Sequence, residues 1–295
     1  MASQTTSSIG DLPDKVCVVT GGGGGIGRAL AHRFAAAGMR IAIGDIEAGA
    51  IDSTVGELGG DGDRIVGLRC DVRSIEDVER LRDETLRRFG SVHLVCLNAG
   101  VAPCGPILGT PLEVWNWVLD VNLRGVIHGV HAFGPLLAEQ RAGHIVCTAS
   151  AAGVTDTPTV APYGASKHAV VGLAAALRSE LAESGVGVSV LCPGLINTRI
   201  FESERNRPAG MEDPSRDNPF SQRYRALLAT SGAPPEQVAE VVYQAVLDNQ
   251  FFVFPTADLD EMIEARIADI RQGLVWRDTV GLGPRPIPRA APPSS

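Results

Sequence analysis

The sequence predicts an α/β fold, a doubly wound parallel sheet of seven strands with helices on both faces. Short apolar runs rich in β-branched residues alternate with longer segments of helical period, which is the pattern of repeated βα units. Most helix-to-strand junctions carry a glycine that ends the helix, as at Gly38, Gly90 and Gly185. The predicted strands span residues 16–20, 40–44, 65–70, 93–97, 144–148, 186–192 and 251–254, and the most periodic helices span residues 26–37, 75–89, 112–137, 163–183 and 235–248.

The length and composition favour one large domain. The chain has 295 residues, of which 44% are hydrophobic and 20% charged, which is enough apolar content for a single core. We expect this domain to span residues 14–283, between poorly ordered segments at residues 1–13 and in the Pro-rich tail 284–295. Residues 195–232 interrupt the alternation with a long polar stretch, and an insertion of that length in an α/β domain predicts a lid.

The charge and the terminal sequence exclude several classes of partner. The formal net charge is −8, from 34 acidic and 26 basic residues, so the chain lacks the positive field of nucleic-acid-binding proteins. No apolar stretch reaches the roughly 18 to 20 residues that span a bilayer, and residues 1–10 are polar without a signal-peptide core. We therefore expect a cytoplasmic protein with no nucleic-acid or membrane partner.

Neither the cysteines nor the histidines show the spacing of a metal site. The six cysteines include no C-x-x-C pair, and five lie in or beside apolar runs, where a reduced thiol packs as a small hydrophobic group. His128 and His131 can share a helix face, but packing or solvation accounts for such a pair more simply than a metal ion. We expect no metal cofactor.

A glycine-rich loop directly after the first predicted strand indicates a phosphate-binding site. Residues 20–28 read Thr-Gly-Gly-Gly-Gly-Gly-Ile-Gly-Arg and lead into a helical pattern. Glycines allow a tight turn and a close approach of the backbone to a pyrophosphate, and the helix N-terminus supplies free N–H groups and positive potential. The loop alone does not select a family, because it fits two patterns. These are G-x-G-x-x-G at Gly22, Gly24 and Gly27, and G-x-x-x-G-x-G at Gly21, Gly25 and Gly27.

Asp45 follows the second predicted strand, about 20 residues beyond this loop. Its carboxylate can accept hydrogen bonds from the adenosine ribose hydroxyls of NAD, and it would repel the 2′-phosphate of NADP. No Arg or Lys stands at Gly24 or Ile46 to offset this repulsion. The sequence therefore favours NAD as the cofactor over NADP. The simpler alternative is that Asp45 only forms the turn after the strand.

Tyr163 and Lys167 stand four residues apart at the start of an Ala-rich helical segment, so their side chains share one face. A phenol with its usual pKa of about 10 is a poor base at neutral pH, but a nearby ammonium and the positive ring of a bound oxidised nicotinamide favour the phenolate. Ser150 follows the fifth predicted strand at the carboxyl edge of the sheet, where open α/β folds bind their ligands. Its hydroxyl can hydrogen-bond a substrate oxygen.

Together these motifs resemble the short-chain dehydrogenase/reductase family over about residues 14–255. Each has a plain structural explanation on its own, such as a strand-ending turn at Asn98 or Pro193, but their joint occurrence in family order does not. The matching motifs are Thr20-Gly-x-x-x-Gly25-Ile-Gly27, Asn98-Ala99-Gly100, Asn122, Ser150, Tyr163-x-x-x-Lys167 and Pro193-Gly194.

The resemblance implies a Rossmann-type fold with a catalytic site made of Asn122, Ser150, Tyr163 and Lys167. Tyr163 would be the general acid and base, and Ser150 would orient the substrate. Lys167 would bind the nicotinamide ribose and lower the pKa of Tyr163, and Asn122 would hold a water in a proton relay behind Lys167. The implied cofactor-binding residues are Gly21, Gly25, Ile26, Gly27, Asp45, Asp71, Val72, Asn98, Ala99, Gly100, Tyr163, Lys167, Pro193, Gly194 and Thr198.

Two positions depart from the family pattern. His93 stands where the family usually carries an aspartate at the head of the fourth strand, and Leu97 stands where it carries a second asparagine. Both positions are mainly structural in the family, so the departures concern local packing more than catalysis.

The activity implied by the resemblance is hydride transfer between nicotinamide and a secondary alcohol or ketone. Apolar residues of the predicted lid could cover a hydrophobic substrate or only fix the lid to the sheet, and both uses stay open. These residues are Ile196, Ile200, Phe201 and Phe220. An NADP-dependent carbonyl reductase and a non-catalytic dinucleotide-binding protein are the alternative functions. In this family the helices at residues 112–137 and 163–183 commonly join subunits, so we expect a homotetramer or else a homodimer.

Overall fold

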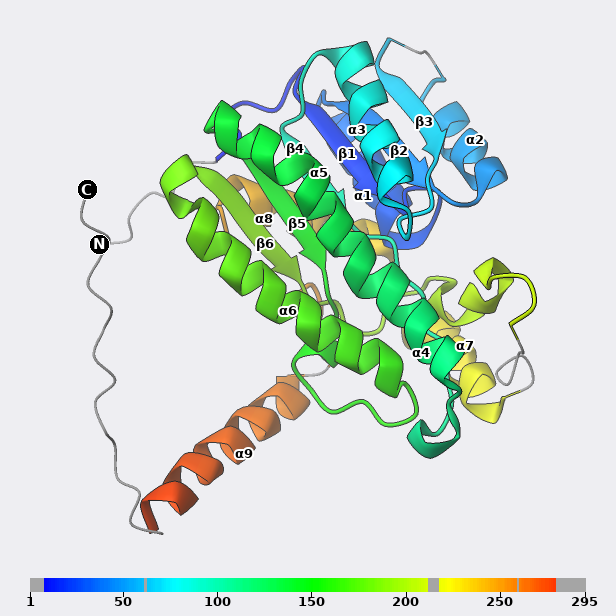
Figure 1. Cartoon of the computed structure of the whole chain (residues 1–295), viewed down its shortest axis with the longest axis vertical. Helices are drawn as coiled ribbons and strands as arrows, with labels where there is room; N and C mark the ends of the chain where they lie inside the picture. The colour runs from blue at the N-terminus through cyan, green and yellow to red at the C-terminus, as the bar shows by residue number, and fades with distance from the viewer. Residues whose placement is uncertain (1–7, 61–62, 212–217, 259, 280–295) are drawn as a thin grey trace.

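The structure is a computed structural model that describes residues 8–60, 63–211, 218–258 and 260–279 (Figure 1). Its strands form one parallel sheet in the order β3-β2-β1-β4-β5-β6-β7. The predicted fold class is confirmed, and the strand ends differ from the prediction by one residue at most. The strands are β1 (Val16–Thr20), β2 (Arg40–Asp45), β3 (Ile65–Arg69), β4 (Leu94–Leu97), β5 (Gly143–Thr148), β6 (Val186–Leu191) and β7 (Phe252–Val253).

The winding of the chain reverses at β1. In the parallel register, Val18 of β1 pairs with Ala42 of β2 on one side and with Val95 of β4 on the other. A crevice forms at such a reversal, at the carboxyl ends of the strands, because the connections leave toward opposite faces of the sheet. The sheet order therefore places a binding site beside the glycine-rich loop that follows β1.

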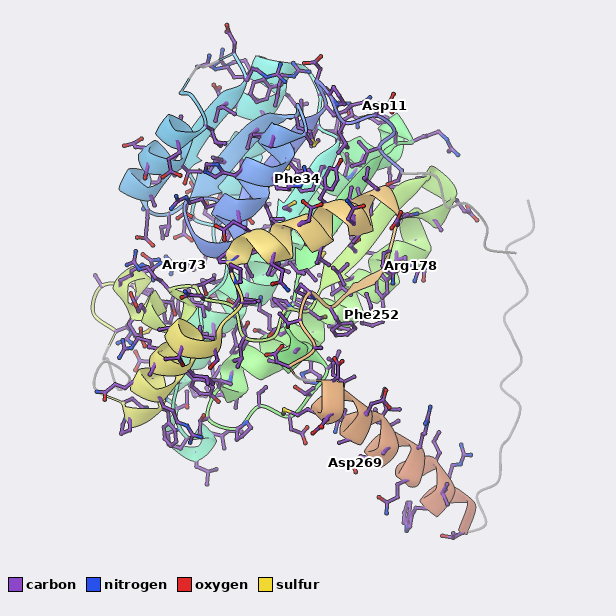
Figure 2. The ribbon with its side chains drawn as sticks, turned by 180° about the vertical axis from the view of Figure 1, so that it is seen from behind. Asp11, Phe34, Arg73, Arg178, Phe252 and Asp269 are labelled. Carbon is purple, nitrogen blue, oxygen red and sulfur yellow. The ribbon has the colours of Figure 1, made fainter. Side chains whose placement is uncertain are left out.

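Helices cover both faces of the sheet, and each face has its own apolar core. Phe133 and Leu137 are fully buried on the face that Figure 1 shows in front, and Leu30 and Phe34 are fully buried on the face seen from behind in Figure 2. Burial on both sides explains why the strands read as continuous apolar runs. The first face carries α3 (Ile75–Phe89), α4 (Leu112–Leu119), α5 (Gly125–Gln140) and α6 (Ala161–Leu181), and the second carries α1 (Gly25–Ala36), α2 (Ala48–Glu57) and α8 (Pro235–Leu247).

Helix α3 illustrates how local sequence sets an element. The Ser74 side chain accepts a hydrogen bond from the backbone N–H of Asp77 at 3.1 Å and so caps the first turn. Gly90 ends the helix with φ 77°, a left-handed conformation that favours glycine. These signals are read from sequence, and the prediction of a helix over residues 75–89 is confirmed without a change of boundary.

The prediction of a single helix over residues 112–137 is wrong about the interior of the helix and about the residue at which it ends. The run is continuous, but α4 and α5 are joined by a π-helical turn, η2 (Asp120–Arg124), and α5 continues to Gln140 despite Pro135. A π turn inserts one residue into the helical repeat, which an apolar period does not reveal. The turn contains Asn122, one of the predicted catalytic residues.

Three helices and several 3-10 turns were not predicted. Helix α2 contains Gly49 and Gly56, which weaken its helical pattern, and α7 (Pro219–Ser231) lies in the polar stretch interpreted as a lid. Helix α9 (Asp260–Thr279) extends away from the sheet and its helices in both views of the molecule (Figures 1 and 2). The 3-10 helices are η1 (Ile107–Gly109), η3 (Ala151–Gly153), η4 (Ala182–Ser184) and η5 (Ile200–Asn206).

The N-terminal expectation is wrong for part of its range. Ile9 and Leu12 are buried against the domain, and the backbone N–H of Gly143 donates to the carbonyl of Ser8 at 3.1 Å, so these three positions are fixed while Gly10, Asp11 and Pro13 are exposed. Residues 1–7 and the tail 284–295 lie outside the described residues. No described helix combines the length and the apolar character that a membrane crossing requires.

Candidate active site

A cleft with a volume of about 1030 Å³ opens at the carboxyl ends of the strands. Its wall is built by the loops after β1, β2, β4, β5 and β6 and by the segment 195–232. Of the predicted site residues, only Gly27 and Asn122 are absent from this wall, and both contact residues that form it. The topology thus brings together side chains from positions 21 to 198.

The glycine-rich loop is shaped by three glycines. Gly21 and Gly25 have φ of +65° and +50°, and a Cβ on Gly27 would lie only 2.1 Å from the carbonyl oxygen of Gly21. In the other pattern, Gly24 is extended and a Cβ there would meet nothing within 4 Å, whereas a Cβ on Gly22 would lie 2.8 Å from the Ile43 side chain. The structure therefore decides between the two patterns in favour of G-x-x-x-G-x-G, and it leaves backbone where side chains would fill a pyrophosphate cradle.

Asp45 forms the acidic end of the cleft. One carboxylate oxygen accepts from the backbone N–H of Gly23 at 2.9 Å, and the other accepts from the N–H of Glu47 at 3.0 Å. These bonds fix the carboxylate at the carboxyl end of β2, facing the glycine loop.

Four arginines line the cleft, and each is paired with a carboxylate. Their positive charge is therefore compensated within the chain, a feature that sequence spacing did not reveal. The pairs are Arg28–Glu57 at 2.7 Å, Arg73–Asp71 at 2.6 Å, Arg199–Glu202 at 3.1 Å and Arg205–Glu47 at 2.8 Å. The pairing with Arg73 holds the pKa of Asp71 below its usual range despite partial burial.

Lys167 is fixed by the end of the neighbouring strand. Its side chain is 2% exposed, and the Nζ donates to the carbonyl oxygen of Thr148, the last residue of β5, at 2.8 Å. Burial lowers the pKa of Lys167 to about 8, because the charged form loses hydration that one carbonyl only partly replaces. The lysine is therefore held as a poorly solvated cation beside the cleft.

Tyr163 lies beside Ser150 and Lys167. Burial raises the pKa of its phenol above the ordinary value, and a hydrogen bond with the Ser150 side chain opposes this rise. The Lys167 Nζ donates to Thr148 and lies 5.5 Å from the centre of the tyrosine ring. The expectation that Lys167 lowers the pKa of Tyr163 stays a prediction.

Ser150 is held in a fixed orientation at the end of β5. Its Oγ accepts from the backbone N–H of Ala152 at 3.1 Å and lies 3.4 Å from the carbonyl oxygen of Pro193. These contacts leave the hydroxyl 8% exposed and next to Tyr163. Ser150 and Tyr163 can therefore contact the same atom of a molecule in the cleft.

Asn122 acts on the wall from behind. Its Oδ1 accepts from the N–H of Val101 at 2.8 Å, while its Nδ2 donates to the carbonyl of Val101 at 2.9 Å and to the Ser166 hydroxyl at 3.1 Å. Both amide hydrogens are used in these bonds, so the side chain positions the loop after β4 against α6. Because both amide hydrogens are already used, Asn122 could hold a water only through another of its atoms.

Asn98 has a similar structural task. Its Nδ2 donates to the carbonyls of Thr20 and Gly21 at 3.2 and 3.4 Å, and its Oδ1 accepts from the Thr148 hydroxyl at 3.4 Å. The side chain therefore joins the ends of β1, β4 and β5 below the cleft.

The two departures from the family pattern are accommodated in the core. The Nδ1 of His93 accepts from the backbone N–H of Val16 at 3.1 Å, and burial lowers the pKa of this imidazole to about 4, so it is neutral at pH 7. Leu97 is 2% exposed, and a Cβ on Gly129 would lie 2.2 Å from its side chain. Both residues are structural in this chain.

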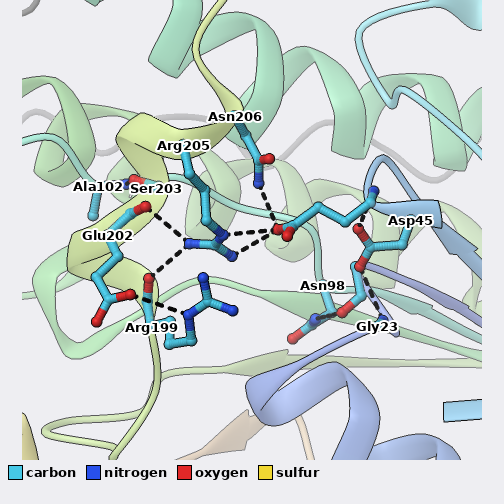
Figure 3. A network of polar contacts seen from close by, with 11 residues as sticks. Gly23, Asp45, Asn98, Ala102, Arg199, Glu202, Ser203, Arg205 and Asn206 are labelled. Carbon is cyan, nitrogen blue, oxygen red and sulfur yellow. Dashed lines mark hydrogen bonds and ion pairs between the residues drawn. The ribbon is translucent and has the colours of Figure 1, made fainter. Parts of the chain in front are cut away.

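Residues 195–206 and part of α7 line the outer side of the cleft, and polar contacts drawn in Figure 3 fix residues 203–206 to other loops. The buried Ser203 hydroxyl accepts from the N–H of Ala102, after β4, at 2.9 Å. Arg205 and Asn206 both donate to one oxygen of Glu47, after β2, at 2.8 to 2.9 Å. We call Glu47, Arg205 and Asn206 the latch; sequence reasoning missed it because no motif links residues so far apart.

The apolar residues of this segment have different roles. Ile196 is 4% exposed and packs in the core, although it borders the cleft. Phe201 stacks on Tyr224 with ring centres 4.6 Å apart, and both line the cleft together with Ile200. Phe220 is 37% exposed and is not part of the wall, so the structure supports neither of the two uses left open for it.

The base of the segment is tied to residues that sequence reasoning did not single out. Gly194 donates its backbone N–H to the Thr256 hydroxyl at 3.2 Å, and Leu195 donates to the carboxylate of Asp258 at 2.8 Å. Both acceptors follow β7, a region without a recognisable motif.

Nothing in the described ranges gathers three or more His, Cys, Asp or Glu side chains as metal ligands. The six cysteines are buried with free thiols, and the Nδ1 of His128 is hydrogen-bonded to the carbonyl of Val72 at 2.8 Å.

Comparison with known proteins identifies what the chain is similar to. Residues 15–209 match the model of the short chain dehydrogenase family. The chain is 35% identical over 257 residues to a C alpha-dehydrogenase of Sphingobium, covering 86% of this chain and 84% of that one. It is 33% identical over 269 residues to a 1-deoxy-11-beta-hydroxypentalenate dehydrogenase of Streptomyces exfoliatus, covering 90% of each.

Among solved structures, a short chain dehydrogenase/reductase from Burkholderia phymatum in complex with NAD superimposes with a TM-score of 0.85 at 34% identity, over 89% of this chain and 96% of that one.

Proposed function

The chain belongs to the short-chain dehydrogenase family, and from this premise we propose that it is an NAD(H)-dependent oxidoreductase that acts on a hydrophobic secondary alcohol or the corresponding ketone. The observation that carries the proposal is the joint placement of Ser150, Tyr163 and Lys167 at one end of a cleft whose other end is Asp45 beside a glycine cradle.

The cleft fits a dinucleotide along its length. The bare backbone at Gly21, Gly25 and Gly27 suits a pyrophosphate, and Asp45 suits the adenosine ribose hydroxyls. The compensated arginines leave Asp45 to repel a 2′-phosphate, which supports NAD over NADP. The remaining predicted contacts, which include Ile26, Val72, Ala99, Gly100 and Thr198, also line the wall.

The nicotinamide supplies the hydride-accepting or hydride-donating carbon when bound. Ser150 holds the substrate oxygen by a hydrogen bond, and Tyr163 takes the alcohol proton in oxidation or returns it in reduction. Lys167 contributes a positive charge, and its hydrogen bond to the Thr148 carbonyl fixes the position of this charge beside the cleft. Burial raises the pKa of Tyr163, and the positive charges of Lys167 and of a bound oxidised nicotinamide would favour its phenolate.

The substrate end of the cleft is apolar. Trp117, Val160, Phe201, Tyr224 and Leu227 line it, which suits a ring-containing or branched alcohol. The names of the two curated relatives, a C alpha-dehydrogenase and a hydroxypentalenate dehydrogenase, support an alcohol group on a bulky carbon skeleton.

A cofactor and substrate screen tests the proposal. The purified chain is incubated with NAD or NADP and a panel of aryl, alicyclic and short linear secondary alcohols, and nicotinamide absorbance is followed. We expect turnover with NAD on the bulky alcohols and weak turnover on the linear ones. Preference for NADP would favour the carbonyl reductase alternative, whereas NAD binding without turnover on any alcohol or ketone would favour the non-catalytic one.

The expected assembly and location accompany this proposal. Of the small residues on α6, Gly172, Ala175 and Ala176 are exposed and suit a close helix contact between subunits, while Ala174 is buried in its own core. A homotetramer or homodimer in the cytoplasm is consistent with these features.

A further inference from the structure

Helix α9 leaves the domain and, for most of its length, packs against none of the described residues of its own chain (Figure 1). Its 20 residues extend for about 30 Å. The helix is tied to the body near its start, where Met262 lines the cleft and Arg266 lies 3.8 Å from Asp156. Helices in proteins owe most of their stability to packing of an apolar face, so a helix in this position needs a partner.

Four apolar residues of α9 form a stripe with heptad spacing, while Met262, Val275 and Trp276, which are 42%, 63% and 65% exposed, lie on other sides of the helix. Ile263, Ile267, Ile270 and Leu274 are separated by four, three and four residues, which places them within about 60° of one another around the helix. The outer part of the stripe is open, since Ile270 and Leu274 are 56% and 52% exposed. A narrow seam of this kind is typical of a helix that pairs with another helix.

The charges beside the stripe are complementary to a second copy in the antiparallel direction. Glu264 and Arg271 are seven residues apart and flank the stripe on the same side. When two copies pair antiparallel about a centre between Ile267 and Ile270, Glu264 of each copy faces Arg271 of the other. The acidic start of the helix, at Asp260 and Glu261, also approaches the basic end of the other copy.

The sheet edge that leads into α9 offers further apolar surface. Phe252 and Phe254 stack with ring centres 5.9 Å apart and are 39% and 40% exposed (Figure 2). A pair of helices buries little area by itself, and this edge would add to the interface. The symmetry of such a contact is a two-fold axis, the commonest in homo-oligomers.

We propose that α9 is an association arm that pairs antiparallel with α9 of a second copy of this chain, with the stripe Ile263, Ile267, Ile270 and Leu274 as its seam and Glu264–Arg271 as its reciprocal ion pairs. The pairing joins two protomers beside their clefts, since the same helix begins at Met262 in the cleft wall.

Charge reversal on the full-length chain tests the arm. Light scattering and sedimentation at micromolar concentration give the mass of the assembly relative to the 30.9 kDa chain. We expect Glu264→Arg and Arg271→Glu each to weaken association at least tenfold, and the double variant to restore it to within about threefold. Asp269→Arg is the matched control, because it reverses a charge on the opposite side of the helix and should leave the mass unchanged.

A second variant removes the seam without touching the ion pairs. Ile270→Asp should halve the mass of the assembly while the thermal unfolding midpoint of the domain stays unchanged, because the residue lies outside the core. A wild-type monomer would overturn the proposal, as would a mass that none of these variants changes or single reversals that the double variant does not rescue. A monomer that cosediments with anionic phospholipid vesicles through α9 would assign the stripe to a membrane surface instead.

Discussion

The two sides of the cleft are held in different ways. On and directly behind the inner wall, Lys167, Asn122 and Ser166 are at most 2% exposed. Hydrogen bonds shielded from water join Asn122 to the loop after β4, Ser166 to Asn122 and Lys167 to the end of β5. On the outer side, the latch fastens the predicted lid with one ion pair, in which the Glu47 and Arg205 side chains are 30% and 32% exposed, and with one hydrogen bond from Asn206. The inner wall contains the proposed catalytic residues, and the outer side borders the entrance to the cleft.

This difference in burial corresponds to a difference in strength. A buried polar group left without its partner costs roughly 1–3 kcal/mol, whereas an exposed ion pair contributes about 0–1 kcal/mol. The residues that must keep their geometry are therefore attached by bonds that are expensive to break. The lid is attached by bonds that break easily, which a cleft that exchanges a dinucleotide requires.

The largest expected effect comes from removing the tyrosine hydroxyl on the inner wall. Tyr163→Phe keeps the ring and the fold but removes the proton acceptor, so turnover should fall by about 10² to 10⁴. NADH affinity, measured by fluorescence titration, should change less than threefold. A variant that turns over its substrate at the wild-type rate would show that Tyr163 is only a packing residue.

The next prediction concerns Lys167, whose replacement should raise the stability of the fold although it removes activity. The pKa of Lys167 is about 8 when folded and 10.5 unfolded, so below pH 8 the folded chain bears the full cost of a buried charge. This cost is about 3 kcal/mol and is relieved as the pH rises from 8 to 10.5, because the unfolded chain binds the extra proton there.

Lys167→Met should therefore abolish activity while raising the free energy of unfolding at pH 7 by about 2 kcal/mol, allowing for the lost bond to Thr148. Urea unfolding without cofactor measures the gain, which should shrink toward pH 10. Lys15→Met, at the only other lysine, is the control. A variant that is less stable at pH 7 would contradict the burial cost.

The third prediction concerns the choice between NAD and NADP, which we attribute to the Asp45 carboxylate. Asp45→Ser combined with Ile46→Arg removes the repelling carboxylate and supplies a phosphate partner, which should raise the NADP-to-NAD ratio of kcat/KM by about ten- to a hundredfold. Steady-state kinetics with both cofactors measure the ratio. The idea fails if the unaltered protein already prefers NADP.

The smallest effect tests the latch. Glu47→Gln removes the charge that holds Arg205, so NADH should dissociate about three- to fivefold faster in stopped-flow fluorescence, and salt should reduce the difference. Glu202→Gln is the matched control, because its pair with Arg199 joins two residues three apart at the start of η5 and does not cross the cleft. Equal dissociation rates for the two variants would show that the latch does not retain the cofactor.

Most of the sheet and the inner wall could be predicted from sequence because their signals are local. Continuous apolar runs mark strands buried on both faces, and Ser74 and Gly90 mark the ends of α3. The π turn at Asn122 and the helices α2, α7 and α9 were not predictable in the same way, since their apolar periods are short, interrupted or exposed.

The sequence by itself determined the fold class, the glycine cradle and the identity of the residues on the inner wall. It did so because each motif is short and its function depends on spacing along one strand or helix. Only the tertiary structure decided which glycine pattern is used, that Lys167 donates to Thr148 with its Nζ 5.5 Å from the centre of the Tyr163 ring, and that Glu47 receives Arg205 from 158 residues away. These outcomes depend on contacts between distant segments and on burial, which shifts charge and pKa by desolvation and leaves no periodic trace in the sequence.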